Sequence, residues 1–256
     1  MQRTSLAVND AAVIGRLIID EPALGSWNMA VDAAILEALS PDSVPTLRFY
    51  RWARPTLSLG YFQALSDRSK HRESQEIDVV RRATGGGAIV HDRELTYSLT
   101  IPTPDQRTGA VSWLYQRVHK CVVAALASSG LHVRRNGRAS SLARESEPFL
   151  CFQRRTDEDL IVSGYKVLGS AQRRGTSGIL QHGSLLLEAS PFAPQLPGLF
   201  EILGSPGQDL CTDIATEIAT VLNCSWMKGA VNAEERHLAM NFEQRRFGNA
   251  SWVGAR

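Results

Sequence analysis

The groups best suited to chemistry in this sequence are a thiol and an amine fifteen positions apart. Cys151 follows a long polar stretch, and Lys166 lies inside the extended segment Tyr165–Leu168. A nearby ammonium group favours the thiolate, which is the nucleophilic form of cysteine. The same lysine, while charged, can stabilise a developing anion. Such a pair, where the fold brings the two groups together, suits nucleophilic catalysis by the thiol.

Three consecutive glycines are the second chemical signal. They lie in residues 81–92, which read RRATGGGAIVHD, between two extended runs. Glycines weaken strands, and the usual compensation is a backbone that approaches another strand or a ligand closely. Free N–H groups of such a loop can stabilise the oxygen of a tetrahedral intermediate. The segment matches neither GxxxxGKS/T nor GxGxxG, so it does not indicate a phosphate loop or a dinucleotide site.

Each signal also has an ordinary structural interpretation. The glycine run can be a bulged turn, and Lys166 can be a strand lysine that faces solvent. Cys151 can be a buried apolar thiol, which is the interpretation that we favour for the other three cysteines. Arg81 and Arg82 can either brace the loop by pairing with carboxylates or contact a phosphate of the substrate.

Periodicity and turn signals predict the elements that position these groups. We expect strands at 13–19, 46–52, 56–61, 77–82, 88–91, 95–101, 159–162, 165–168 and 179–187. Helices are expected at about 27–39 with Ser26 as N-cap, at 66–76, at 111–126 with Gly130 as its stop, and from Asn232 to about 247. The pair Ser163-Gly164 predicts a hairpin, and loops are expected at 136–149 and 191–207.

Length and composition restrict the class of protein. No internal repeat or linker divides the 256 residues, so we expect one catalytic domain over 1–256, with a helical tail at about 209–256 and no large accessory C-terminal domain. The formal net charge of +2 does not indicate a nucleic-acid binder. No secretory layout and no window near the ~18 apolar residues of a membrane span is present. The four widely spaced cysteines argue against a metal site or disulfides and favour the cytoplasm.

Four segments occur in an order that is typical of one protein family. Residues 28–32, NMAVD, are similar to its first-helix signature, and residues 81–92 to RRxTGGGxVxHD. Residues 164–172, GYKVLGSAQ, are similar to G-x-K-I/V-x-G-S/A-A/S, and residues 181–186, QHGSLL, to Q/H-H-G-S/T-L/I-L. The sequence therefore resembles the biotin/lipoate A/B protein ligase family, which contains lipoate–protein ligases, octanoyltransferases, lipoyl amidotransferases and biotin ligases.

The resemblance implies a fold and a site. The fold is α+β, with a large mixed, mostly antiparallel sheet, a smaller sheet and flanking helices, as in class II aminoacyl-tRNA synthetases and biotinyl protein ligases. Cys151 and Lys166 would be catalytic. The residues that the resemblance implies for substrate binding are Arg81, Arg82, Thr84, Gly85, Gly86, Gly87, His91, Gly169, Ser170, Ala171, His182, Gly183 and Ser184.

A cysteine followed by a D-L-I/V-V strand and then the lysine strand is most similar to the cysteine-dependent octanoyltransferases. This similarity implies transfer of an octanoyl (or lipoyl) group from acyl carrier protein, through Cys151, to a lysine of a lipoyl domain or glycine-cleavage H protein, in lipoate biosynthesis. No cofactor, nucleic acid or membrane would take part. An ATP-dependent lipoate–protein ligase, which would need ATP and Mg²⁺, a lipoyl-domain amidotransferase and a non-catalytic binding module remain as alternatives. Biotin ligation fits less well, because those enzymes carry a GRGR-type loop.

Overall fold

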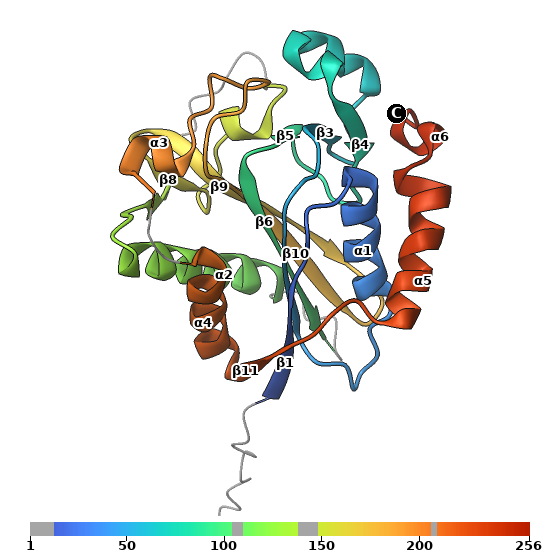
Figure 1. Cartoon of the computed structure of the whole chain (residues 1–256), viewed down its shortest axis with the longest axis vertical. Coiled ribbons are helices and arrows are strands. Elements are labelled where there is room, and N and C mark those ends of the chain that lie inside the picture. Colours follow the sequence, from blue (N-terminus) through green and yellow to red (C-terminus); the bar gives the residue numbers. More distant parts are fainter. Residues whose placement is uncertain (1–12, 104–109, 138–147, 206–208) are drawn as a thin grey trace, which may run out of the picture.

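Two β-sheets form the framework of the computed structural model, which describes residues 13–103, 110–137, 148–205 and 209–256 (Figure 1). The large sheet has the strand order β11-β1-β2-β6-β10-β9-β8-β7, and the small sheet the order β4-β3-β5. The strands are β1 (Val13–Ile19), β2 (Thr46–Tyr50), β3 (Thr56–Leu59), β4 (Asp78–Arg81), β5 (Ile89–His91), β6 (Glu94–Pro102), β7 (Arg134–Arg135), β8 (Leu160–Val162), β9 (Tyr165–Arg174), β10 (Gly178–Leu186) and β11 (Cys224–Lys228).

Strand direction confirms the predicted fold class. Among the described strands of the large sheet, β1 runs parallel to β2 and β11, while the other five pairings are antiparallel. The sheet is therefore mixed and mostly antiparallel, beside a smaller sheet, and the protein is α+β.

Helices cover both faces of the large sheet (Figure 1). On one face α1 (Gly25–Glu37) packs against α5 (Ala233–Phe242), and on the other α2 (Ala110–Ser128) packs against α4 (Leu210–Leu222). Shorter helices are α3 (Leu199–Leu203), α6 (Ala250–Val253), the 3-10 turns Leu65–Lys70, Arg72–Glu76 and Cys151–Gln153, and the π turn Glu243–Phe247. No helix in the described ranges is both long enough and apolar enough to cross a bilayer.

Strand β6 shows how the sequence separates core from site. Leu95, Tyr97 and Leu99 belong to the apolar core that α2 and α4 cover. The alternate side chains are polar and buried: Thr96 accepts a hydrogen bond from Trp52, and Ser98 donates one to a carboxylate of α1. Because successive strand residues point to opposite faces, the polar side of β6 faces α1 and the small sheet. The candidate site lies on this side.

Several local predictions are confirmed and others are wrong. The turn residues of the predicted hairpin, Ser163 and Gly164, have φ of 47° and 83°, and Asn232 caps α5 in a capping box with Glu235. Ser26 is not the N-cap of α1, because the helix begins at Gly25, two residues earlier than predicted, and the Ser26 hydroxyl donates to Glu243 instead. Residues 65–76 form two 3-10 turns, and α3 interrupts the expected loop at 191–207. Of the expected loop 136–149, positions 138–147 lie outside the described residues.

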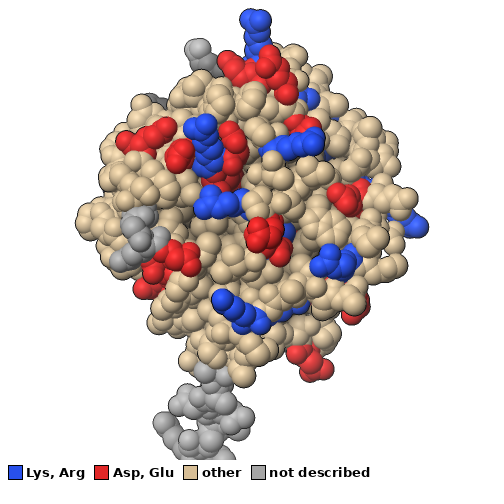
Figure 2. Space-filling view, viewed as in Figure 1, with Lys and Arg blue, Asp and Glu red and all other residues tan. Residues whose placement is uncertain are grey.

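The tail that follows residue 209 contains a strand that the sequence did not reveal. β11 pairs in parallel with β1 and extends the large sheet. Arg16 of β1 forms an ion pair with Glu235 of α5, which fixes the tail to the same edge. On the face shown in Figure 2, acidic and basic side chains are interspersed, in keeping with the small net charge.

Candidate active site

The structure brings the two predicted catalytic side chains together. Cys151 begins the 3-10 turn Cys151–Gln153, and Lys166 comes from β9. Lys166 Nζ lies 3.6 Å from Cys151 Sγ and 3.5 Å from its carbonyl oxygen. Cys151 is half-buried and lines a pocket, whereas the Lys166 side chain is buried. An ammonium group is therefore in contact with an accessible thiol.

Lys166 also has a buried counter-charge that we did not identify from the sequence. Asp159 Oδ2 lies 3.0 Å from Lys166 Nζ and accepts a hydrogen bond from the backbone N–H of Thr156 at 2.6 Å. Removing two such charges from water is costly unless they compensate each other, and this pair does so. The predicted hairpin could have identified Asp159. In it β8 and β9 pair with Leu160 opposite Leu168, which places Asp159 next to Gly169 and within reach of Lys166.

The glycine loop lies against the backbone of Cys151. Cys151 N–H donates to the Ala88 carbonyl at 2.7 Å, and a Cβ on Gly87 would lie only 3.0 Å from Cys151 N. Gly86 has φ of +96°, a conformation that favours glycine. Within the described chain, the N–H groups of the three glycines donate to no protein acceptor. Gly85 and Gly86 also line the pocket, so their N–H groups are available to an oxygen of the substrate.

The two arginines before this loop have different roles. Arg81 is buried, and its guanidinium donates to backbone carbonyls at Gly60, Gln63 and Val253, so it braces residues 60–63 and α6. Arg82 is also buried and donates to the carbonyls of Gly85 and Gly87, yet it lines the pocket. Burial lowers the pKa of Arg82 to about 10, and the electrostatic attraction of Cys151 offsets part of this shift. Its Nε is buried and has no partner in the described residues.

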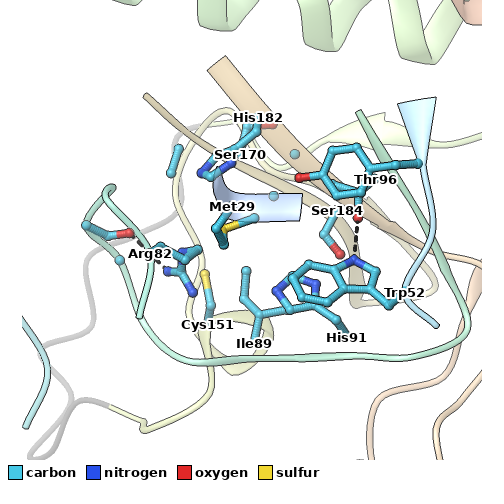
Figure 3. A pocket seen from close by; sticks show the side chains of 16 residues that line it. Met29, Trp52, Arg82, Ile89, His91, Thr96, Cys151, Ser170, His182 and Ser184 are labelled. Atoms are coloured by element: carbon cyan, nitrogen blue, oxygen red, sulfur yellow. Dashed lines mark hydrogen bonds between the residues drawn. The ribbon is translucent and has the colours of Figure 1, made fainter. Parts of the chain in front are cut away.

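A mainly apolar pocket connects these groups (Figure 3). It encloses about 440 Å³ including its opening. The Arg82 and Cys151 side chains lie together at one end, and Trp52 and His91 at the other. The lining residues are Met29, Tyr50, Trp52, Arg82, Gly85, Gly86, Ile89, His91, Thr96, Cys151, Gly169, Ser170, Ala171, His182, Gly183 and Ser184. Such a cavity, apolar with a few convergent polar groups, is typical of a small-ligand site.

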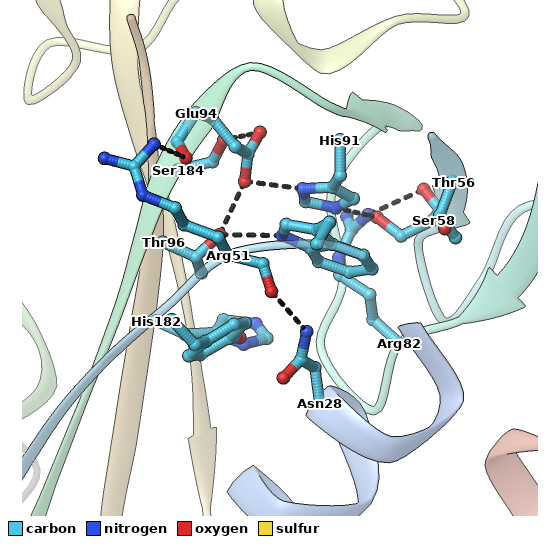
Figure 4. A network of polar contacts seen from close by, with 12 residues as sticks. Asn28, Arg51, Thr56, Ser58, Arg82, His91, Glu94, Thr96, His182 and Ser184 are labelled. Carbon is cyan, nitrogen blue, oxygen red and sulfur yellow. Dashed lines mark hydrogen bonds and ion pairs between the residues drawn. The ribbon is translucent and has the colours of Figure 1, made fainter. Parts of the chain in front are cut away.

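A polar network holds one end of the pocket (Figure 4). His91 stacks on Trp52 with ring centroids 3.8 Å apart. Its Nδ1 lies 2.8 Å from the Glu94 carboxylate, and its Nε2 lies 2.7 Å from the Ser58 hydroxyl, which accepts from Arg82. Ser58 must therefore donate to Nε2, and a neutral His91 donates through Nδ1 to Glu94. Both ring nitrogens are occupied, so His91 offers the substrate its ring face.

Burial and hydrogen bonding have opposite effects on the pKa of Glu94 in this network. Burial alone would raise the pKa of Glu94, but His91 and the hydroxyls of Ser184 and Thr96 hold it below its ordinary value. Burial lowers the pKa of His91, so the imidazole stays neutral beside the carboxylate. The predicted residue Ser184 therefore acts through Glu94 as well as through the pocket wall.

The glycine loop is tied to the main sheet through His182. Thr84 Oγ1 lies 2.8 Å from His182 Nε2, and His182 Nδ1 lies 3.4 Å from the Asp32 carboxylate of α1. Asp32 also accepts hydrogen bonds from Arg48 and Tyr50. Burial alone would raise the pKa of Asp32, but His182 and Arg48 hold it below its ordinary value. This bonding sets the distance between the loop and β10.

The β9 residues of the site are supported from the α2 side. The Gln181 amide donates to the Tyr97 hydroxyl oxygen, and the Tyr97 hydroxyl in turn donates to Ser170 Oγ at 2.7 Å. Ser170 then donates to His119 Nε2, also at 2.7 Å, and His119 Nδ1 donates to the Glu158 carbonyl at 2.6 Å. These directions fix one tautomer of a neutral His119, and burial lowers its pKa to about 4.

The predicted residues thus fall into three groups. Cys151 and most of the implied binding residues line the pocket, and Lys166 contacts Cys151. Thr84 and Gly87 shape the loop beside the pocket, and Arg81 lies away from it. The Ser170 N–H already donates to the Tyr115 hydroxyl at 3.1 Å. No sequence signal identified His119 or Glu94, because His119 meets Ser170 across 51 positions and Ser184 meets Glu94 across 90. In the part of the chain that is described, no group of three or more His, Cys, Asp or Glu side chains is arranged to hold a metal ion.

Comparison with known sequences gives a consistent family. Residues 25–207 match the model of the lipoyl protein ligase A/B catalytic domain. An octanoyltransferase LipM from Clostridioides difficile is 37% identical over 180 residues, covering 68% of this chain and 65% of the relative. An octanoyltransferase LipM from Carboxydothermus hydrogenoformans is 39% identical over 171 residues, covering 64% and 61%. The chain thus spans less than two thirds of the length of these relatives.

Solved structures share the fold. A lipoate-protein ligase A bound with ATP superposes with a TM-score of 0.78 at 21% identity, covering 94% of this chain and 99% of that one. A bipartite lipoate protein ligase from Thermoplasma acidophilum, described with its E2 lipoyl domain, superposes with a TM-score of 0.76 at 20% identity, covering 94% and 96%. Identities this low show the fold alone.

Proposed function

The chain belongs to the lipoyl protein ligase A/B catalytic domain family, and from this premise we propose that it is a cysteine-dependent octanoyltransferase. It moves an octanoyl (or lipoyl) group from acyl carrier protein to a lysine of a lipoyl domain or glycine-cleavage H protein, in cytoplasmic lipoate biosynthesis. The contact of 3.6 Å between Cys151 Sγ and Lys166 Nζ, in the wall of an apolar pocket, carries the proposal. The octanoyltransferase relatives support it.

The first step forms an acyl-enzyme on Cys151. The thiolate attacks the thioester carbonyl of the donor, a new C–S bond forms, and the C–S bond to the carrier breaks. The leaving carrier thiolate takes up the proton that Cys151 lost, so thiol and thioester exchange without net proton release. The Lys166 ammonium group stabilises the attacking thiolate because it is a cation in contact with Cys151 Sγ. Asp159 offsets the cost of burying this ammonium group and holds it in position.

The second step transfers the acyl group to nitrogen. A neutral lysine amine of the acceptor attacks the acyl-enzyme, the C–N bond forms and the bond to Cys151 Sγ breaks. The proton from the amine returns to the Cys151 thiolate. In both steps the N–H groups of Gly85 and Gly86, which line the pocket and have no acceptor among the described residues, are donors for the negative oxygen of the tetrahedral intermediate. Thioester exchange is nearly balanced in free energy, so no nucleotide takes part in this scheme.

The alternative within the family is an ATP-dependent lipoate–protein ligase, which would use ATP and Mg²⁺ and bind the adenylate at Lys166. Such a reaction has no need of a thiol at position 151. A lipoyl-domain amidotransferase would use the same cysteine with a different donor. The accessible position of Cys151 beside Lys166 favours the two thiol mechanisms over the ligase.

Intact-mass spectrometry after mixing the protein with octanoyl-acyl carrier protein tests the proposal. We expect a mass gain of one octanoyl group that hydroxylamine removes and that disappears in Cys151→Ser. Cys211→Ser is the matched control, because burial raises the pKa of Cys211 to about 11 and keeps that thiol unreactive. Full activity of Cys151→Ser with lipoate and ATP would instead select the ligase, and an octanoyl group gained from a lipoyl domain alone would select the amidotransferase.

A further inference from the structure

A group of arginines lies beside the glycine loop, outside the Cys151 pocket. Arg173, Arg174 and Arg246 line a wide hollow together with Ala83 and Thr84 of the loop. Arg173 follows Ala171 by two residues on β9, and Ala171 lines the Cys151 pocket. Because alternate strand residues share a face, the two Cα atoms are about 7 Å apart along the same side of the sheet. The hollow therefore adjoins the candidate active site.

These arginines lack counter-charges within the described ranges. Neither Arg173, Arg174, Arg246 nor the C-terminal Arg256 forms an ion pair with a described carboxylate. Arg173 donates to the Ala83 carbonyl, which directs its charge along the loop.

Two carboxylates also line the hollow, and neither neutralises the charge of these arginines. Asp32 is buried and paired with Arg48, while Glu37 forms no ion pair with a described arginine. Burial and the neighbouring Arg173 lower the pKa of Arg246. The buried Nε of Arg246 has no hydrogen-bond partner among the described residues. Like charges held together in this way cost electrostatic free energy that an anionic partner would release.

Aromatic rings hold two of these cations in place. The Arg246 guanidinium lies 4.0 Å from the centre of the Trp252 ring, and that of Arg256 lies 4.7 Å from the Tyr61 ring. Phe62, beside them, is 75% exposed and faces Gly85, whose Cβ would lie 3.8 Å from the Phe62 ring. Stacking orders the guanidinium groups before binding. Exposed aromatic rings among arginines are typical of the centres of protein interfaces.

We propose that this arginine surface, formed by Phe62, Arg173, Arg174, Arg246 and Arg256, docks an acidic face of the protein that carries the acyl group to Cys151. The inference rests on the proposed function and adds the chemistry of its donor partner. Arginines without counter-charges attract the carboxylates of a partner, and the exposed Phe62 ring offers that partner an apolar contact. The whole chain has a net charge of only +2, so the attraction is local to this surface.

The position of the arginine surface favours the donor over the acceptor. An acyl group borne as a thioester on an extended arm can reach Cys151 while its carrier docks beside the pocket. An acceptor lysine has only its own side chain, so the acceptor domain has to approach Cys151 directly. The surface adjoins the Thr84 side of the loop, whereas Cys151 contacts the Gly87 side.

The test compares a protein-borne donor with a small one. Acyl-enzyme formation is measured with octanoyl-acyl carrier protein and with octanoyl-pantetheine, which has no charge, for the wild type and for Arg174→Glu/Arg246→Glu. We expect the KM for the carrier protein to rise by about 10-fold or more with kcat nearly unchanged, and the small thioester to react as before. Lys120→Glu/Arg134→Glu, with the same change of charge at exposed residues of α2 and β7, should leave both donors unaffected.

Added salt provides a second readout. The wild-type KM for the carrier protein should rise with ionic strength, and that dependence should flatten in the Arg174→Glu/Arg246→Glu variant. Equal losses with both donors, or no loss with the carrier protein, would overturn the docking surface.

A loss that already occurs with octanoyl-4′-phosphopantetheine would overturn it as well, because the arginines would then bind the phosphate of the arm. Direct titration of the carrier protein onto Cys151→Ser separates this inference from the proposed function. Salt-sensitive binding that needs Arg174 and Arg246 would support docking even where no acyl group is transferred. The absence of such binding would refute docking even where octanoyl-pantetheine acylates Cys151.

Discussion

Gly169→Ala tests whether the placement of the Lys166 ammonium group determines the reactivity of Cys151. A Cβ at position 169 would lie 2.5 Å from Lys166 Cε and 2.8 Å from Nζ. Ordinary contacts between such atoms are about 3.5–4.0 Å, so the end of the lysine side chain must move by about 1 Å. The obstacle is flexible, so the chain should still fold. The ammonium group, however, would leave its position 3.6 Å from Cys151 Sγ.

The expected effect is on rate. A displacement of about 1 Å in a positioned group can cost about 100-fold, so we expect acyl-enzyme formation under single-turnover conditions to slow by about 100-fold. Intact-mass spectrometry of quenched samples measures this rate, and thermal unfolding checks that the variant remains cooperative.

A double-mutant cycle assigns the effect to the lysine. In a Lys166→Ala background the two contacts that are too close are gone and the contact with Asp159 Oδ1 at 3.6 Å is an ordinary one, so adding Gly169→Ala should slow the reaction no further. A wild-type rate for Gly169→Ala alone would refute the role of ammonium placement. An equal additional loss in the Lys166→Ala background would show that the substitution acts on something else.

Three further predictions concern the supports of the site. Burial lowers the pKa of His119 to about 4 from an ordinary 6.5, so between these pH values His119 is protonated in the unfolded chain and neutral in the folded chain. The free energy of unfolding should therefore fall by about 3 kcal/mol from pH 7 to pH 4. Urea titrations of His119→Gln should show a smaller fall. Asp159→Asn leaves the Lys166 ammonium buried without a counter-charge and should lower the free energy of unfolding by about 3–5 kcal/mol in urea titrations, whereas the double variant with Lys166→Met should regain much of it. Arg81→Met removes donors from backbone carbonyls that include Val253, so hydrogen exchange should show faster opening of α6, and unchanged exchange would contradict the bracing role.

The α+β class was predictable because alternation and turn signals are local in sequence, whereas the meeting of Cys151 with Lys166 was implied by the family resemblance of the segments around them. Alternation specifies strands such as β6 and β10, and Ser163-Gly164 specifies the turn that pairs β8 with β9. Four motifs in a fixed order implied that the glycine loop and β10 belong to one site, and residues of both line the pocket.

The supports of the site were not predictable, since each depends on a contact that only the fold creates. His119 lies in an amphipathic helix and meets Ser170 across 51 positions, and nothing in either segment specifies the partner. β11 is a strand of five mostly exposed residues at the edge of the described sheet, so it is too short and too little buried to show the alternation that reveals a strand. The difference between Arg81 and Arg82 depends on the fold, because Arg81 ends β4 and donates to Val253 while Arg82 follows the strand and donates to Gly87, and the sequence shows only two identical side chains.

The charges around Cys151 suggest why so many buried groups surround one sulfur atom. With Cys151 as a thiolate, Arg82 and Lys166 balance the thiolate and Asp159, so the cluster of four groups is neutral. Acylation removes the negative charge from sulfur and leaves the cluster with one net positive charge. That charge stabilises the oxyanion of the second tetrahedral intermediate and repels an ammonium group, so the acceptor lysine reacts in its neutral form. Asp159 thus has two roles, because it keeps the cluster neutral before acylation and limits its positive charge afterwards.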